Sequence, residues 1–88
     1  MANVESRMLA YIQQRISAGA PAVPESEVMN AVIPPQHPEN RYRPAYRHGL
    51  ERLLRRHKIN GRMDSKGESH YFLEDYPSKE LEEWISNQ

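Results

Sequence analysis

The chain has 88 residues, 38% of them hydrophobic and 27% charged, which suits one small globular domain better than a disordered chain. It contains no cysteine, so disulfides, thiolate metal sites and cysteine nucleophiles are excluded. A cysteine-free composition fits a reducing cytoplasm. No apolar run approaches the roughly 18–20 residues of a membrane helix. We therefore expect a single cytoplasmic domain without a membrane contact.

The charges are unevenly distributed, although 12 basic and 12 acidic side chains cancel in total. Residues 1–40 have a net charge of −2, residues 41–66 a net charge of +7, and residues 67–88 a net charge of −5. A strongly basic segment is the usual electrostatic signature of a nucleic-acid partner. The distribution of charge therefore favours such a partner, which the net charge alone would not.

The first half of the chain shows two helix patterns. Residues 3–17 carry an apolar stripe at three- and four-residue steps, with Asn3 suited to cap the helix and Gly19 to end it. Residues 20–23 are expected to be extended, because a proline disfavours helix in the residue before it. Residues 24–33 predict a second helix with a proline in its first turn. The apolar positions of the two helices are Val4, Met8, Tyr11, Ile12, Ile16, Val28, Met29, Val32 and Ile33.

The second half contains signals for two more helices and a hairpin. Residues 36–43 are expected to form a loop, and residues 44–57 a third helix with a proline at its first position. Residues 59–74 predict a β-hairpin, because residues 64–67 all favour turns. Residues 78–87 predict a last helix that begins at a serine cap.

This order of elements resembles the winged helix-turn-helix superfamily of DNA-binding domains. The resemblance covers about residues 4–73 and implies an α+β fold: a three-helix core with a β-hairpin wing, here followed by a C-terminal helix. In that superfamily the third helix, here 44–57, usually enters the DNA major groove. The extended segment, here 20–23, often pairs with the wing, here 59–73.

A helical wheel of the third helix separates an apolar arc from a cationic one. With about 100° per residue, Tyr46, Leu50, Leu53 and Leu54 fall on one side and are expected to be buried. The opposite side carries His48 and several arginines, whose planar guanidinium groups pair well with guanine or phosphate. An ordinary solvated helix face is the alternative interpretation.

We expect nucleic-acid contacts from the third helix, the segment before it and the wing. The N-terminal half of a helix in the major groove lies closest to the bases, so Arg47, His48 and Arg52 are expected to contact base edges. The remaining side chains are expected to meet phosphates. The complete set is Arg41, Arg43, Arg47, His48, Arg52, Arg55, Arg56, Arg62 and Lys66.

Catalysis is not expected from this sequence. The four histidines have no metal-ligand spacing such as His-x₃-His, and no glycine-rich phosphate loop is present. The acidic pair Glu82-Glu83 falls on the predicted last helix, where a solvated face explains it. We therefore expect no catalytic residue, no metal ligand and no cofactor.

The predicted last helix has an acidic side and an apolar side. Its apolar residues, Leu81, Trp84 and Ile85, are expected to pack on the domain. Two alternatives are a homodimer interface, with Trp84 as its anchor, and a contact with another protein.

Together these patterns predict a small DNA-binding protein that acts as a transcriptional regulator and reads duplex DNA with its third helix and basic wing. The alternative is a winged-helix module for protein–protein interaction that does not bind DNA. RNA binding through the same basic face is a weaker third interpretation.

Overall fold

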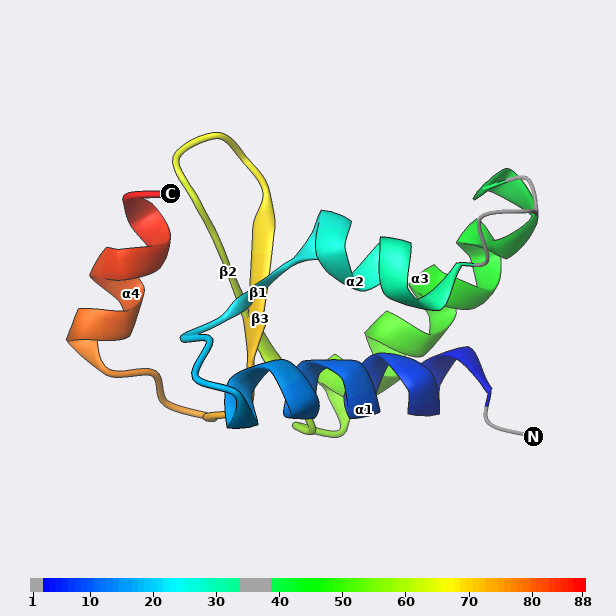
Figure 1. Ribbon diagram of the computed structural model, residues 1–88, viewed down its shortest axis with the longest axis horizontal. Coiled ribbons are helices and arrows are strands. Elements are labelled where there is room, and N and C mark those ends of the chain that lie inside the picture. Colours follow the sequence, from blue (N-terminus) through cyan, green and yellow to red (C-terminus); the bar gives the residue numbers. More distant parts are fainter. Residues whose placement is uncertain (1–2, 34–38) are drawn as a thin grey trace.

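The computed structural model describes residues 3–33 and 39–88, except for the side chains of residues 39–42. In chain order the elements are α1 (Val4–Ser17), β1 (Val23–Pro24), α2 (Glu25–Val32), α3 (Glu39–Arg55), β2 (Asn60–Met63), β3 (Ser69–Phe72) and α4 (Lys79–Ser86). The strands form one antiparallel sheet in the order β1-β3-β2 (Figure 1). The expected α+β class is therefore confirmed.

The predicted N-caps of the first and last helices are present. The Asn3 side chain accepts a hydrogen bond from the backbone N–H of Ser6 at 2.8 Å, which satisfies one free donor at the start of α1. The Ser78 hydroxyl accepts from the N–H of Leu81 at 3.1 Å and begins α4 in the same way. Beyond the end of α1, Gly19 has a φ of 108°, a left-handed conformation that glycine adopts easily.

The start of α3 differs from the sequence prediction. Residues 39–43 are helical rather than part of a loop, whereas residues 36–38 of the expected loop lie outside the described part. Pro44 therefore lies inside the helix instead of beginning it. A proline lacks the N–H that would bond to the carbonyl of residue 40, and this costs about 3 kcal/mol or more in a helix interior. The proline is nevertheless compatible with helical φ, so the turns on either side of it stay helical.

The end of α3 is closed by two backbone hydrogen bonds. The N–H of Lys58 donates to the carbonyl of Leu53 at 3.0 Å, and the N–H of His57 donates to that of Leu54 at 3.1 Å. These are the two bonds of a Schellman motif, which needs a left-handed residue just beyond the helix. His57 supplies it with a φ of 57°. The helix therefore ends at Arg55, two residues before the predicted end.

The hairpin forms at the predicted place. The N–H of Asp64 donates to the carbonyl of Glu68 at 2.9 Å, and Gly67 adopts a φ of 88°, so the turn lies over residues 64–67. The expected extended segment is shorter than predicted, because only Val23 of residues 20–23 is in a strand. Val23 pairs with Tyr71 of β3, as the resemblance implied.

The sheet is covered on both faces. Tyr71 packs with Met8, Ile12 and Leu53 in a core between the sheet and α1–α3. The next residue, Phe72, points to the opposite face and packs with Ile85 of α4. Figure 1 accordingly shows α4 on one side of the strands and the other three helices on the other side. Among the described residues, no helix is long and apolar enough to cross a membrane.

The buried side of α3 is narrower than the wheel predicted. Tyr46 and Leu53 are buried and Leu50 is partly buried, but Leu54 is 37% exposed. Gly49 lies where α3 contacts α1. A Cβ added there would lie 3.2 Å from the Cα of Glu5. The expected burial of Leu54 is therefore wrong, because α1 covers the arc centred on Gly49.

Candidate nucleic-acid interface

The solvent face of α3 carries two arginines and a histidine whose side chains have no partner in the described part of the chain. Arg47, His48 and Arg55 are exposed, and their side chains make no hydrogen bond or ion pair with described residues. Lys58, just beyond the helix and not among the predicted contacts, is also exposed. This part of the predicted set is therefore available to an anionic ligand.

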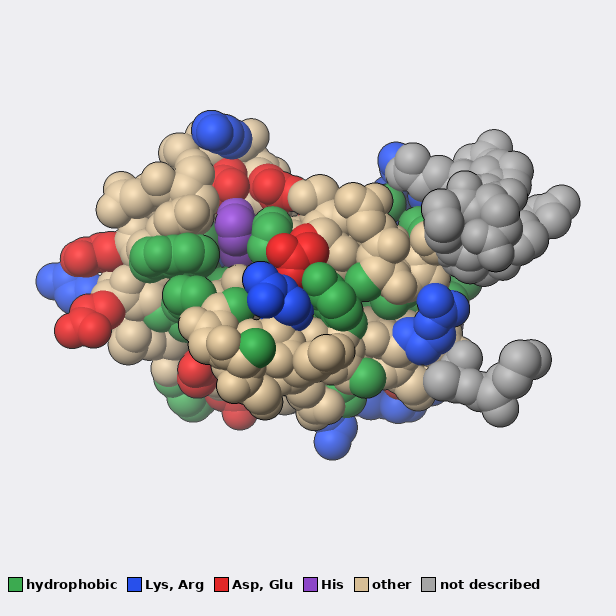
Figure 2. All heavy atoms as spheres, viewed as in Figure 1, with side chains coloured by type: hydrophobic (Ala, Val, Ile, Leu, Met, Phe, Trp, Pro, Cys, Tyr) green, Lys and Arg blue, Asp and Glu red, His purple; other side chains and the backbone are tan. Residues whose placement is uncertain are grey.

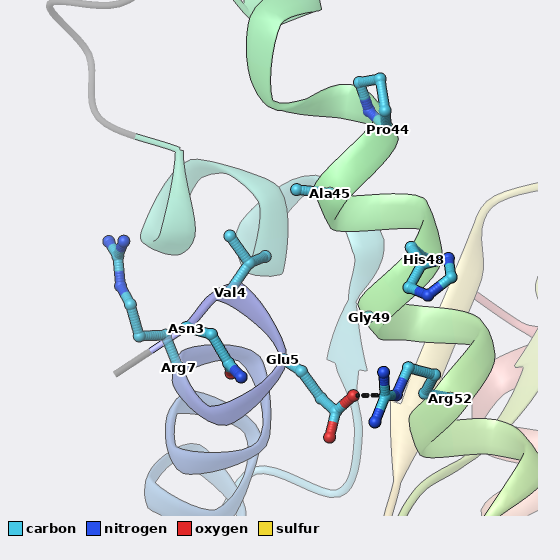
Figure 3. Close-up of a pocket in the computed structure, with 9 residues that line it drawn as sticks. All are labelled: Asn3, Val4, Glu5, Arg7, Pro44, Ala45, His48, Gly49 and Arg52. Atoms are coloured by element: carbon cyan, nitrogen blue, oxygen red, sulfur yellow. Dashed lines mark ion pairs between the residues drawn. The ribbon is translucent and has the colours of Figure 1, made fainter. Parts of the chain in front are cut away.

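Arg52 and Arg56 are instead shared with an acid of α1. The Nε of Arg52 lies 2.9 Å from Oε1 of Glu5, and Nη1 of Arg56 lies 3.6 Å from its Oε2. The Glu5 side chain is 21% exposed, whereas the two arginines are about half exposed. Figure 3 shows the Glu5–Arg52 pair bridging the two helices. Arg52 and Arg56, which are both predicted to contact nucleic acid, are therefore partly neutralised by Glu5.

A groove lies between the start of α1 and α3. It has a volume of about 720 Å³ and is lined by Asn3, Val4, Glu5, Arg7, Pro44, Ala45, His48, Gly49 and Arg52. In Figure 3, His48 and Arg52 lie one turn apart along α3, and Arg7 extends away from the Glu5–Arg52 pair. The lining includes three residues of basic type, Arg7, His48 and Arg52, and one acidic residue, Glu5.

Arg41 and Arg43, the two predicted phosphate contacts that precede Pro44, lie in a segment that is only partly described. Arg43 is exposed and makes an interaction within the protein. The side chain of Arg41 lies outside the described part of the chain. Phosphate contacts from these two residues stay a prediction.

The two cations of the hairpin have different surroundings. The Nε of Arg62 lies 3.2 Å from Oε1 of Glu82 on α4, and its Nη1 donates to the carbonyl of Gly61 at 2.8 Å. Lys66 is exposed at the tip, and its side chain has no partner among the described residues. The acidic helix α4 therefore neutralises Arg62, whereas Lys66 stays available to an anionic ligand.

The surface on the side of α1 and α2 does not carry one sign of charge. Figure 2 shows basic and acidic side chains interspersed on this face. One example is Arg15, whose Nε lies 2.7 Å from Oε2 of Glu27. The hydroxyl of Tyr11 donates to the same oxygen at 2.7 Å, and together they hold the pKa of the Glu27 carboxyl below its usual value. A binding site for an anionic ligand is therefore better supported on α3 than on this face of mixed charge.

The apolar side of α4 packs within the chain. Ile85 is fully buried against Phe72 and Ala22, so it is not a surface residue as a dimer or partner contact would require. Leu81 is partly buried against the same cluster. Trp84 is 37% exposed and meets the His70 ring edge to face, with ring centroids 6.3 Å apart.

A polar cluster in the hairpin was not predicted. His70 is buried, and its Nε2 lies 2.9 Å from Oδ2 of Asp64, whose side chain is only 4% exposed. The hydrogen bond from His70 and the backbone N–H of Glu68 lower the pKa of the Asp64 carboxyl. The available signal was the predicted hairpin, because side chains two residues apart in an extended chain, such as Glu68 and His70, point to the same side.

Burial also raises the pKa of two tyrosine hydroxyls above their ordinary value. Tyr46 lies between α2 and α3, and its hydroxyl has no hydrogen-bond partner in the described part. The hydroxyl of Tyr71 donates to Oε2 of Glu25 at 2.6 Å. Both hydroxyls therefore stay protonated at neutral pH and serve as packing and hydrogen-bonding groups.

Comparison with known proteins gives no assignment. No protein-family model matches the chain, and neither a curated protein nor a solved structure shows significant similarity to it.

Proposed function

We propose that the protein binds duplex DNA through the solvent face of α3, in the manner of a winged-helix transcriptional regulator. The observation that carries this proposal is the set of exposed side chains of Arg47, His48 and Arg55 on one helix, two of them cationic, which form no hydrogen bond or ion pair with described residues. The arrangement of the chain supports it, because a hairpin follows α3 and β1 pairs with that hairpin.

Each residue has a defined role in this proposal. A helix in the major groove presents its N-terminal half to the bases, so Arg47 and His48 contact base edges. Arg55 and Lys66 neutralise phosphates, because the backbone lies on either side of the groove. Arg52 joins them when a phosphate replaces the Glu5 carboxylate as its partner.

The test is a fluorescence-anisotropy titration of a labelled random duplex at several salt concentrations. Binding is expected to weaken steeply with salt, because each phosphate contact releases a counterion. Arg55→Ala should weaken binding and make the salt slope shallower by about one unit. Lys79→Ala is the matched control, since it removes an exposed cation from α4, on the other side of the sheet.

Circular dichroism of each variant first establishes that it is folded, because arginine stems also contribute to packing. Absence of salt-dependent duplex binding by the folded parent contradicts the proposal and favours the protein-interaction alternative. Equal losses in Arg55→Ala and Lys79→Ala contradict the assignment to α3. Tighter binding to an RNA of the same length redirects the proposal to RNA.

A further inference from the structure

The hairpin brings together three side chains that are typical metal ligands. Asp64 lies in the turn, Glu68 immediately precedes β3, and His70 is in β3. One carboxylate oxygen from each acid and one imidazole nitrogen all lie within 4.8 Å of one another. Two ligands of a tetrahedral zinc ion are about 3.3–3.6 Å apart, given zinc–ligand distances of about 2.0–2.2 Å. The widest pair of ligand atoms therefore has to approach by on the order of 1 Å, and the partly exposed Glu68 can supply this movement.

The carboxylates are oriented by backbone hydrogen bonds. Oδ1 of Asp64 accepts from the N–H of Lys66 at 2.8 Å and from that of Glu68 at 3.0 Å. Oε2 of Glu68 accepts from the N–H of Ser26 at 3.1 Å. Each acid thus uses one oxygen for the backbone. The second oxygen of Asp64, Oδ2, faces Nε2 of His70 at 2.9 Å, and an ion bound by both atoms would replace this hydrogen bond. Hydrogen bonds of this kind, behind the ligand atoms, are what fix ligands in metal sites.

The charge of the cluster is not balanced by a permanent cation. Two carboxylates contribute −2, and no lysine or arginine forms an ion pair with either of them in the described part of the chain. Nearby like charges with restricted solvent access favour uptake of a cation. The one group in ion-pair contact is His70, which is charged only when it is protonated.

The buried imidazole is suited to coordinate through Nε2. His70 is 5% exposed, its Nε2 faces Asp64, and its Nδ1 has no hydrogen-bond partner in the described part. Coordination through Nε2 moves the ring proton to Nδ1, away from the ion.

We propose that Asp64, Glu68 and His70 bind a divalent transition-metal ion of the zinc class. One imidazole nitrogen with two carboxylate oxygens suits zinc, whereas magnesium and calcium prefer oxygen ligands alone. Water completes the coordination on the exposed side of Glu68. The site connects the hairpin turn with β3 and, through Glu68 and Ser26, with the start of α2. It is independent of the proposed DNA contacts on α3.

The experiment titrates the chelator-treated full chain with zinc chloride, by calorimetry and by thermal unfolding. One zinc ion per chain and a higher melting temperature are expected, with no shift from magnesium chloride at the same concentration. In NMR spectra the ring signals of His70 should move, and those of the exposed His48 should not. No zinc uptake, or a shift only at exposed histidines, overturns the proposal and leaves His70–Asp64 as a structural hydrogen bond.

Variants separate this cluster from adventitious surface binding. Glu68→Gln is expected to weaken zinc binding on the order of tenfold or more, while its amide oxygen still accepts from Ser26. His48→Asn and Glu80→Gln alter an exposed histidine and an exposed acid elsewhere, and should leave zinc binding unchanged. Unchanged affinity in folded Glu68→Gln, or a loss in His48→Asn, overturns the assignment.

Discussion

The Glu5 carboxylate of α1 partly neutralises two arginines of the neighbouring helix α3. The absence of a side chain at Gly49 allows α1 and α3 to approach closely, and this places Glu5 beside Arg52 and Arg56. A carboxylate in this position occupies the guanidinium groups that a phosphate would otherwise contact. In the proposed complex Glu5 therefore competes with DNA.

Glu5→Gln is expected to strengthen duplex binding, because it frees Arg52 and Arg56 for phosphates. The salt slope should steepen by up to about two units, one for each added phosphate contact. The measurement is the anisotropy titration at several salt concentrations, with Glu80→Gln as a control of equal charge change on α4. If the two variants bind alike, Arg52 and Arg56 do not contact DNA.

Glu27 is a second residue whose charge matters, this time for stability. The Tyr11 hydroxyl and the Arg15 guanidinium lower the pKa of this carboxyl from its ordinary 4.5. A lowered folded-state pKa means that the contribution is complete above pH 4.5 and is lost as pH falls through the lowered value. Glu27→Gln should therefore lose less stability than the parent between pH 6 and pH 3, as measured by urea unfolding. Parallel pH profiles would show that the ion pair contributes nothing.

At the scale of the element, α3 illustrates which features local signals can predict. Its apolar repeat correctly indicated a helix, with Tyr46 and Leu53 in the core. The width of the buried arc depends on how closely α1 approaches, and only the folded contact at Gly49 determines that distance. Pro44 suits a first turn and so predicts a start at residue 44, whereas α3 begins five residues earlier, at Glu39.

Leu53 and Leu54 form a matched pair for testing this packing. Leu53→Ala should destabilise the fold by about 2–5 kcal/mol, because it empties a position that is 2% exposed. Leu54→Ala removes the same atoms from a position that is 37% exposed, so a clearly smaller loss is expected. Urea unfolding of both variants measures the difference. Equal losses would mean that Leu54 packs as the wheel predicted.

The end of α3 gives an independent test of backbone strain. His57 adopts a φ of 57°, a conformation that costs a residue with a side chain roughly 1–2 kcal/mol. Glycine avoids this cost but loses more entropy on folding, by roughly 0.5–1 kcal/mol. His57→Gly is therefore expected to stabilise the protein by up to about 1.5 kcal/mol in urea unfolding. A destabilised variant would indicate that the imidazole makes a compensating contribution.

At the scale of the whole molecule, the element order was predictable but the pairing of charges was not. Caps, turns and apolar periods act over a few residues, so they identified four helices and a hairpin in the described part. Arg62 pairs with Glu82, 20 residues away, and Asp64 meets His70 only because the hairpin folds back. Such contacts depend on tertiary structure, and they divide the predicted basic surface into neutralised and available parts.

The distribution of charge, rather than its total, should govern DNA binding. Arg55→Glu and Lys79→Glu change the net charge by the same amount, but Arg55 lies on the solvent face of α3 and Lys79 on α4. Arg55→Glu should reduce duplex affinity substantially, because it removes a phosphate contact and adds repulsion at the interface. Lys79→Glu should reduce it only slightly, by an amount that falls further as salt screens long-range repulsion. Equal reductions at every salt concentration would show that the total charge decides, and that no particular face is presented to the DNA.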